Sequence, residues 1–405
     1  MATPKLRFKE FEGSWLTSKI GEVFEVTSGA TPLRSNKEFF KNANIPWVKT
    51  TDLNNAVITH TEEQISKIAL ESTSVKMLPK DTVFVAMYGG FNQIGRTGLL
   101  LNEAACNQAL SAIYPNENIS SFFLLSYLNH NVKEWKTFAA SSRKDPNITK
   151  KDVLSFPFNY PTLKEQTKIA TFLSTVDTKI DELTQKHELL TDYKKGMMQQ
   201  IFSQKLRFKA DDGSDFEDWD DITLGEISSK SLAKNKDESI SEVLTNSATQ
   251  GVIKQSDYFE RDIVTTSNLK GYYVVEIGDF VYNPRISSQA PVGPIKRNKQ
   301  CLGVMSPLYT VFTTNKGDIN YLEYFFESSI WHDYVKSVSN SGARHDRMNI
   351  KNQDFFDMPI LYPCLAEQTK IANFLNSIDQ KIDNVTEQID HAKTWKRGLL
   401  QQMFV

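Results

Sequence analysis

Apolar residues recur at the a and d positions of a seven-residue pattern in two stretches of the chain. In the first stretch these positions hold Leu173, Val176, Ile180, Leu183, Leu190, Met197 and Ile201. In the second they hold Leu375, Ile378, Ile382, Val385, Ile389, Leu399 and Met403. This spacing predicts two long helices, each packed against another helix. Two amphipathic helices packed on separate cores are the alternative. Polar residues in the stripe, His187, Lys194 and Lys396, would fix the register of a coiled coil.

The two helical stretches are copies of one sequence. LKEQTKIATFLSTVDTKID begins at Leu163 and LAEQTKIANFLNSIDQKID begins at Leu365. Both copies extend upstream to an Asn-Ile pair, at 147–148 and at 349–350. A second phrase, KLRFK, stands at 5–9 and 205–209 and is followed each time by a tryptophan. Such self-similarity indicates an internal duplication.

The order of the repeated phrases predicts how the helices run. About forty helical residues span ~60 Å, and segment 205–364 joins the end of the first helix to the start of the second. An antiparallel pair needs the shorter connection. The final QQMFV matches QQIFS, which leads into KLRFK in mid-chain, and the chain also opens with KLRFK. We therefore expect a ring cut at a helix end, with a pseudo-twofold axis and a globular domain at each end of a helical rod. Thr162 and Glu165 predict a capping box where the first helix begins.

We divide the chain into a first domain (1–160), a central helix (161–204), a second domain (205–362) and a C-terminal helix (363–405). Each domain combines short strands, at 82–87 and 279–282, with a helix near its end, at 121–139 and 319–338. The expected fold class is α+β, with two mixed α/β domains joined by two long antiparallel coiled-coil helices. The frames repeat, but 30–115 and 230–310 do not align. This contrast indicates two modules that do the same job on different targets.

Composition narrows the function further. The net charge of −2 and the isoelectric point of about 6.4 argue against a generic, charge-driven nucleic-acid binder but allow a local basic patch. Three cysteines without metal or disulfide spacing suit a reducing cytoplasm. No apolar run approaches the ~18 residues of a membrane span, and the opening residues lack a signal core.

No catalytic constellation is evident. Gly90 to Thr97 nearly spells a phosphate-binding loop, but Arg96 stands where that loop needs lysine. Asn283-Pro284-Arg285-Ile286 resembles the Asn-Pro-Pro-aromatic stretch of amino-methyltransferases, but the second proline and the aromatic residue are missing from this chain. None of the six histidines has zinc-site spacing. We expect no metal site and no enzymatic activity of the chain's own.

Basic and polar residues gather in loops of both domains. In the first domain they are Arg34, Lys49, Thr50, Tyr88, Asn92, Gln93, Arg96, Ser142, Arg143 and Lys144. In the second they are Arg285, Ser287, Gln289, Arg297, Arg344, His345 and Arg347. Arg, Asn and Gln read base edges, and Ser, Thr and Lys hold phosphates. Ordinary solvated loops have similar compositions, but 141–147 and 343–349 occupy equivalent places just before the repeated Asn-Ile. We therefore predict DNA binding by these loops.

The chain resembles the specificity (S) subunits of type I restriction-modification systems along essentially its whole length. The resemblance is carried by SGATP (28–32), IPWVKTTDL (45–53), AMYGG (86–90), NQA (107–109), GDFVYNPR (278–285) and SPLY (306–309), together with the repeated helices and KLRF openings. It implies that each domain is a target recognition domain that reads one half of an asymmetric, bipartite site in double-stranded DNA. The helices would set the spacer between the halves.

The resemblance also implies the partners. Two methyltransferase (M) subunits would carry S-adenosylmethionine, and restriction (R) subunits would add ATP and Mg chemistry, so that this chain would need no cofactor. For the helical frame that contacts partners we take Leu173, Ile180, Leu183, Leu190, Leu375, Ile382, Ile389 and Leu399. A coiled-coil scaffold with protein-binding end domains is the main alternative. A nuclease or methyltransferase ranks third.

Overall fold

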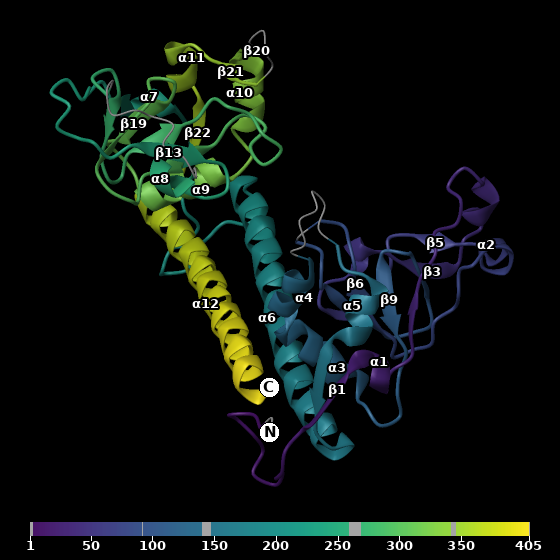
Figure 1. The fold of residues 1–405 in the computed structure, drawn as a ribbon. Helices are drawn as coiled ribbons and strands as arrows, with labels where there is room; N and C mark the ends of the chain where they lie inside the picture. The colour runs from purple at the N-terminus through teal and green to yellow at the C-terminus, as the bar shows by residue number, and fades with distance from the viewer. Residues whose placement is uncertain (1–2, 91, 140–146, 259–268, 342–345, 405) are drawn as a thin grey trace. The chain divides into compact units, whose positions relative to one another are not determined.

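The computed structural model describes residues 3–90, 92–139, 147–258, 269–341 and 346–404. The chain forms two compact units. The first comprises residues 1–185 and 386–405, and the second comprises residues 186–385. Each unit contains one α/β domain and one half of each long helix (Figure 1).

The two long helices are α6 (Leu163–Phe202) and α12 (Leu365–Met403). Residues 163–185 of α6 share the first unit with 386–403 of α12, and 186–202 share the second unit with 365–385. The start of each helix thus accompanies the end of the other, which confirms the antiparallel arrangement. The same ion pair occurs once in each unit, between Asp177 and Lys396 and between Asp379 and Lys194. Both lysines are polar residues of the predicted stripe.

A five-stranded sheet forms the centre of the first domain, in the order β2 (Val26–Ser28), β9 (Leu110–Ile113), β6 (Val83–Ala86), β7 (Thr97–Leu100), β4 (Ala56–Ile58). Side chains alternate between the two faces of a strand. Val83 and Val85 therefore enter the main core, while Phe84 and Ala86 enter a second apolar cluster. A smaller sheet joins β5 (Gln64–Ile65), β3 (Ile45–Val48) and β8 (Ala105–Cys106) beside α2 (Lys67–Ser72).

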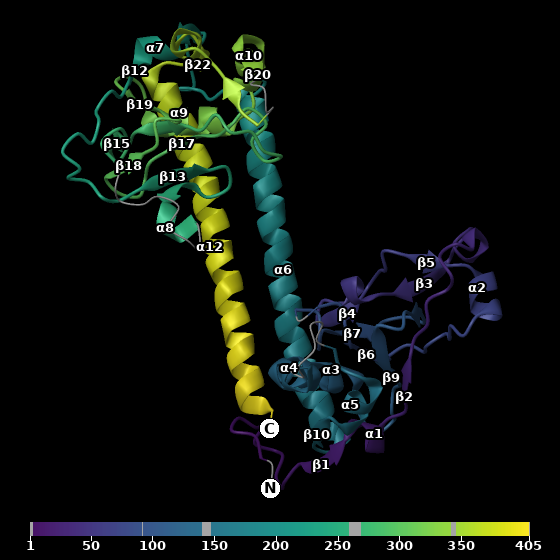
Figure 2. The same cartoon turned by 45° about the horizontal axis from the view of Figure 1, so that its top comes forward.

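The second domain repeats the central sheet with four strands, in the order β12 (Ser228–Lys230), β19 (Thr310–Thr314), β16 (Phe280–Tyr282), β17 (Ile295–Arg297) (Figure 2). Three further pairs lie beside this sheet in sequence, β13 (Leu244–Ser247) with β14 (Gly251–Lys254), β15 (Tyr273–Val275) with β18 (Gly303–Met305) and β20 (Asn340–Ser341) with β21 (Met348–Asn349). The central frame is thus shared by the two domains, and the additional strands are arranged differently.

Short elements close each domain in the same way. β1 (Leu16–Lys19) pairs with β10 (Pro157–Tyr160), and β11 (Asp220–Thr223) pairs with β22 (Pro359–Tyr362). The helices α1 (Ile20–Val23) and α7 (Leu224–Ile227) follow the first strand of each pair, and α5 (Lys150–Ser155) and α11 (Asn352–Phe356) precede the second.

Each helix expected near the end of a domain is two helices instead. The stretch 121–139 divides into α3 (Ser121–His130) and α4 (Val132–Ala139), and 319–338 divides into α9 (Ile319–Glu327) and α10 (His332–Val338). The Asn131 side chain donates to the carbonyl of Tyr127, and Ser328 Oγ bonds the backbone of Phe325 and Ile330. Such local side-chain bonds compete with helix continuation.

The glutamate of each repeated EQTKIA binds an arginine of KLRFK. Arg7 donates from Nε and Nη2 to Glu165, at 2.8 Å in both bonds. Arg207 makes the corresponding bonds to Glu367, at 3.2 and 2.8 Å. The tryptophan after each KLRFK, Trp15 or Trp219, donates its indole N–H to the same carboxylate. The capping-box prediction was therefore wrong, because Glu165 faces Arg7 and Trp15 rather than Thr162.

The glutamine next to each glutamate ties the long helix to the start of α3 or α9. Gln166 donates to the carbonyl of Pro161 at 2.8 Å and accepts from the backbone N–H of Ser120 at 3.0 Å. Gln368 makes the same two bonds, to Pro363 at 2.7 Å and from Asp318 at 2.7 Å. Both glutamines are about 1% exposed or less. The repeated Glu-Gln thus encodes the attachment of each domain to its helix.

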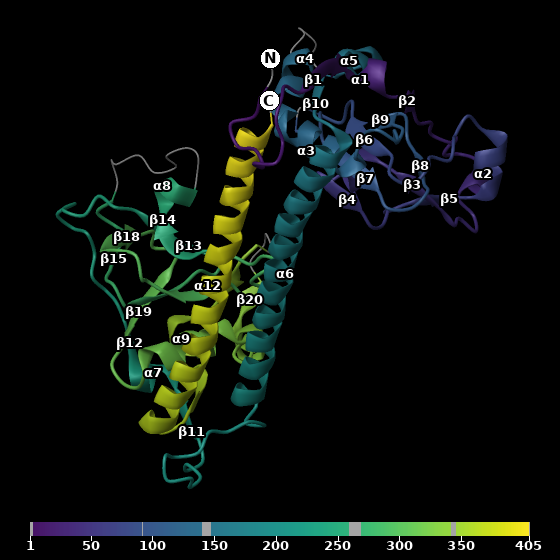
Figure 3. The same ribbon diagram turned by 90° about the horizontal axis from the view of Figure 1, so that it is seen from below.

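The ring-like order of the phrases is also visible in the backbone. The N–H of Leu206 bonds the carbonyl of Gln200 at the end of α6, at 3.1 Å. In the first unit the N–H of Leu6 bonds the carbonyl of Gln402 near the end of α12, at 2.8 Å. The opening KLRFK therefore lies where a continuation of α12 would place it, beside the end of that helix (Figure 3).

Candidate nucleic-acid interface

In each domain, the loop after the central strand lies against the segment that precedes the last short helix. In the first domain the N–H of Ile148 bonds the carbonyl of Met87, at 2.9 Å. In the second, the N–H of Met348 bonds the carbonyl of Pro284 at 2.9 Å, and the N–H of Ile286 bonds that of Asp346 at 3.1 Å. The loops after β6 and β16 thus contact equivalent segments of the two domains, at Ile148 and at Met348. Ser142, Arg143, Lys144, Arg344 and His345 lie outside the described residues.

In the first domain this loop begins at Tyr88, whose hydroxyl donates to the carbonyl of Gln108 at 2.7 Å. Burial raises the pKa of Tyr88, so the hydroxyl keeps the proton that it donates. The next residue, Gly89, has φ +120°, which glycine adopts readily. A Cβ atom added to Gly89 would lie 3.6 Å from Thr50 Oγ1. The 3-10 turn η2 (Thr50–Asp52) is therefore beside the loop.

The rest of the loop is polar. Asn92 is exposed, while Gln93 and Arg96 are half-buried. The Oε1 atom of Gln93 is buried and accepts no hydrogen bond from the residues that the structure describes. The loop therefore presents amide and guanidinium groups beside Thr50 and Tyr88. The structure brings these five predicted residues into one neighbourhood.

Arg34 and Lys49 are occupied by carboxylates of their own domain. Arg34 Nη1 lies 2.5 Å from Glu63 Oε2, and Lys49 Nζ lies 2.8 Å from Glu63 and 3.0 Å from Glu62. Hydrogen bonds from Arg34 and then Lys49 lower the pKa of Glu63 to about 2. The Arg34 guanidinium also lies over the ring of Trp47, 5.1 Å from its centroid. A phosphate would have to compete with these partners for both cations.

In the second domain the loop after β16 carries Arg285, Ser287 and Gln289, all exposed. Arg285 forms no ion pair with any described residue, so its guanidinium is available to a phosphate or a base. Arg297, on β17, differs: its Nη2 lies 2.7 Å from Glu323 of α9, and its side chain is 14% exposed. In this conformation Arg297 joins the sheet to α9.

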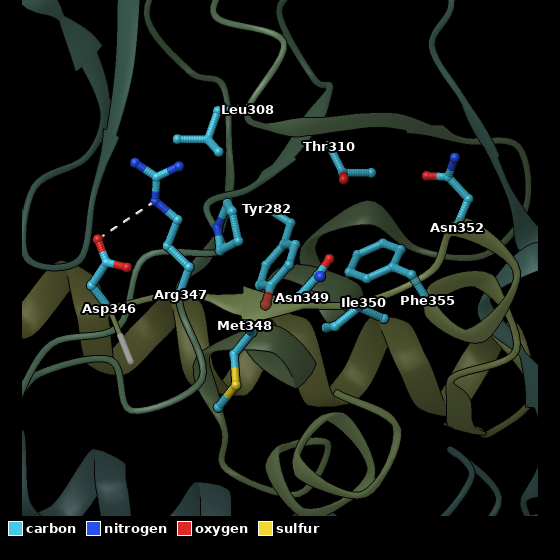
Figure 4. A pocket seen from close by; sticks show the side chains of 11 residues that line it. Tyr282, Leu308, Thr310, Asp346, Arg347, Met348, Asn349, Ile350, Asn352 and Phe355 are labelled. Carbon is cyan, nitrogen blue, oxygen red and sulfur yellow. Dashed lines mark ion pairs between the residues drawn. The ribbon is translucent and has the colours of Figure 1, made fainter. Parts of the chain in front are cut away.

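Two cavities adjoin this loop. The first, of about 510 Å³, is lined by Tyr282, Phe355 and Met348 together with polar residues such as Thr310 and Asn352 (Figure 4). Its lining also contains an ion pair between Arg347 Nε and Asp346, at 3.7 Å. The second cavity, of about 480 Å³, shares Leu308 with the first and is lined by Arg285 and Ser287. Arg347 lies opposite Arg285 in an isolated antiparallel bridge, which places the two arginines on neighbouring backbone segments.

Residues that the sequence did not single out as DNA-binding complete the second cavity. They are Asn246 of β13, Tyr258 at the end of α8 (Gln255–Tyr258), Tyr272 before β15 and Tyr309 before β19. They come from separate segments and converge only through strand pairing. No local pattern could have grouped them.

The apolar residues assigned to the helical frame form its interior. Leu173, Leu183, Leu375, Ile389 and Leu399 are buried, and Ile180, Leu190 and Ile382 are half-buried. Their contact with partner subunits stays a prediction. Tyr193 and Trp395 were missed, although they occupy the same position in the two copies and are 51% and 53% exposed. An exposed aromatic residue at both equivalent positions was the available signal.

Metal binding and membrane insertion find no support in the described ranges. No three His, Cys, Asp or Glu side chains gather there in a way that could hold a metal ion. None of the helices described combines the length and the apolar character needed to span a bilayer.

Comparison with known proteins identifies the family. A family model described as the type I restriction modification DNA specificity domain matches residues 12–191 and, a second time, residues 216–393. The chain belongs to this family. The double match agrees with the duplication and supports the resemblance inferred from the sequence.

Individual relatives agree with this family. The specificity subunit of the Escherichia coli type I restriction enzyme EcoR124I/EcoR124II is 27% identical over 44% of this chain, which spans 45% of that protein. The MjaVIII specificity subunit of Methanocaldococcus jannaschii is 24% identical over 97% of this chain and 94% of that protein. The chain thus spans less than half of the E. coli relative but nearly all of the archaeal one.

Solved structures share the fold. The S subunit of a type I system from M. genitalium aligns with 100% of this chain and 99% of its own, at 14% identity and a TM-score of 0.57. A chain from a study of complex assembly in a type I R-M system aligns over 98% of both chains, at 16% identity and a TM-score of 0.59. The predicted fold class is therefore confirmed.

Proposed function

We propose that this chain is the non-catalytic specificity subunit of a type I restriction-modification complex and binds double-stranded DNA in a sequence-dependent way. One observation carries the proposal. Two domains with the same frame place a polar loop at the same point, after the central strand, and fill it with different residues. Such a pair can read two different half-sites through one kind of contact.

The antiparallel helices would serve as a spacer between the two recognition domains. Each unit repeats the same lysine–aspartate pair and the same arginine–glutamate attachment. A partner that recognises one copy of this frame can therefore recognise the other, which suits two identical methyltransferase subunits. S-adenosylmethionine, ATP and Mg would be bound by partner subunits, in keeping with the absence of a catalytic constellation from the sequence motifs. We expect the complex to be cytoplasmic.

A protein-binding scaffold is the competing function. It would use the same helices but would need no polar, divergent loop at the end of the central strand in each domain. The guanidinium of Arg285, which no described residue pairs, lies beside exposed Ser287 and Gln289. This arrangement favours DNA, because these groups match phosphates and base edges.

A genome-wide map of N6-methyladenine tests the proposal. In cells that make this chain with its neighbouring methyltransferase, we expect one asymmetric, split motif that disappears when the chain is deleted. Replacing residues 10–160 with the corresponding segment of another family member should change one half of that motif and leave the other intact. If an active methyltransferase shows no motif that depends on this chain, the scaffold function is favoured.

A further inference from the structure

The second cavity of the second domain has features that are not needed to contact base edges in a DNA groove. Three tyrosines, Tyr258, Tyr272 and Tyr309, line a space of about 480 Å³ together with Arg285 and Ser287 of the candidate DNA loop. A contact to a base edge in the groove of a duplex needs an exposed side chain but no concave pocket.

The inner wall of the cavity is held by interlocked asparagines. Asn246 donates to the carbonyls of Val281 at 2.7 Å and Pro294 at 3.2 Å. Asn283 donates to the carbonyl of Asn246 at 2.9 Å and accepts from the N–H of Arg285 at 3.1 Å. The backbone of the candidate DNA loop is therefore tied to β13 at the edge of the cavity.

The same wall leaves one acceptor without a donor. Asn246 is 2% exposed, and its Oδ1 accepts no hydrogen bond from the part of the chain that is described. A buried acceptor without a donor costs about 1–3 kcal/mol.

The lining matches a flat ring with polar edges. Tyrosine rings supply apolar faces on which a base can stack, and Arg285 supplies a cation for the adjoining phosphate. The hydroxyl of Tyr309 lies 3.2 Å from Thr245 Oγ1, so this pair can offer a donor or an acceptor to the edge of a base. A nucleobase has a flat ring and polar edges, but it can enter such a space only after it leaves the helical stack.

We propose that this cavity binds one unstacked base of the half-site read by the second domain, a base other than the adenine that is methylated. The inference rests on the DNA recognition proposed above. The tyrosines come from segments 230–310 and have no alignable counterpart in the first domain. Extrusion is therefore confined to one half of the target.

Mismatched duplexes test the proposal with the complete complex of this chain and its methyltransferase. For each base pair of the second half-site, two mismatched duplexes are made. In one the base on the first strand is changed, and in the other the base on the second strand is changed. A mismatch lowers the cost of extruding the unchanged base. We expect binding to tighten about tenfold at one position, whereas mismatches in the first half-site leave affinity unchanged or reduced.

Variants locate the effect. In Tyr272→Leu and Tyr309→Leu the gain at that position should disappear, while selection of the first half-site, an internal control for folding, is retained. Tyr273→Leu is the matched control, because Tyr273 stands next to Tyr272 but does not line the cavity. Its gain should persist.

The outcomes separate this inference from the function on which it rests. Sequence-dependent binding without a tightening mismatch, or a gain that survives both cavity variants, would overturn the extruded base and leave the recognition function intact. A complex without any sequence-dependent DNA binding would overturn both.

Discussion

The attachment of the second domain to α12 depends on a buried carboxylate. Glu367 is fully buried and accepts three hydrogen bonds, two from Arg207 and one from Trp219 at 2.9 Å. The hydrogen bond to Glu367 also raises the pKa of Arg207. Arg207→Met would remove two of the three donors and leave a buried negative charge with one. We expect the second unit to lose stability.

The magnitude follows from the burial of the two partners. Breaking a buried ion pair by removing one partner costs about 3–5 kcal/mol. The Arg207 side chain is 24% exposed, so the lower end, about 3 kcal/mol, is expected. Glu367→Gln should cost less, because the amide oxygen still accepts from Trp219. In the double variant the two losses should fall short of their sum by about 2 kcal/mol.

Hydrogen exchange of the first turns of α12, residues 365–376, measures the local opening free energy. The first turns of α6 in the other unit report whether the effect is local. Lys205→Met is the matched control, since Lys205 belongs to the same KLRFK segment, is exposed and forms no ion pair with the described residues. A coupling energy below about 0.5 kcal/mol between Arg207 and Glu367 would refute the reasoning.

Three further predictions concern recognition and the frame. Arg285→Ala should weaken binding to the second half-site about tenfold and spare the first, whereas an equal loss at both, measured by competition binding, would contradict local contact. An insertion of fourteen residues in each long helix, after Gln185 in α6 and after Val385 in α12, adds ~21 Å to that helix. The spacer of the methylated motif should then lengthen by about 6 base pairs at 3.4 Å each. Altered half-sites would refute the spacer role. A permuted chain that joins the end of α12 to KLRFK and opens between Gln204 and Lys205 should methylate the same motif, and loss of folding would refute the ring.

Long helices and their pairing were predictable because one pattern spans many residues and occurs twice. The observed α6, Leu163–Phe202, lies within the predicted 161–204. The ring order was also readable, since in mid-chain the helix-end phrase QQIFS runs directly into KLRFK. Repetition thus converts a weak local signal into a constraint on tertiary structure.

Charge pairing was not predictable in the same way. Arg34, Lys49 and Arg297 read as free loop cations, yet their partners Glu62, Glu63 and Glu323 are set by strand pairing and by the packing of α9. Thr162 and Glu165 matched a local capping motif that a distant arginine overrode. The contacts of each of these side chains are determined by tertiary partners that sequence spacing does not encode.

The two domains owe part of their cores to the opposite copy of the repeat. Phe404, at the end of α12, packs against Phe123 at 5.4 Å and stacks on His130 at 5.8 Å in the first unit. Phe202, at the end of α6, packs against Tyr321 at 5.8 Å and Phe325 at 5.9 Å in the second. Neither copy of the repeat therefore completes its own core.

This exchange explains why the frame is repeated so closely while the loops differ. A change in a helix-end phenylalanine, or in the glutamate that holds KLRFK, would affect the domain of the other copy or the attachment of its own. The described residues of the loops after β6 and β16 neither pack in the core of the other copy nor hold KLRFK. Recognition can therefore change by replacing the middle of one domain, provided that its KLRFK arginine, its tryptophan and its helix-facing aromatic residues are kept. A transplanted domain that keeps the loops but lacks that arginine should fail to assemble on the frame, and native mass spectrometry with the methyltransferase would detect the failure.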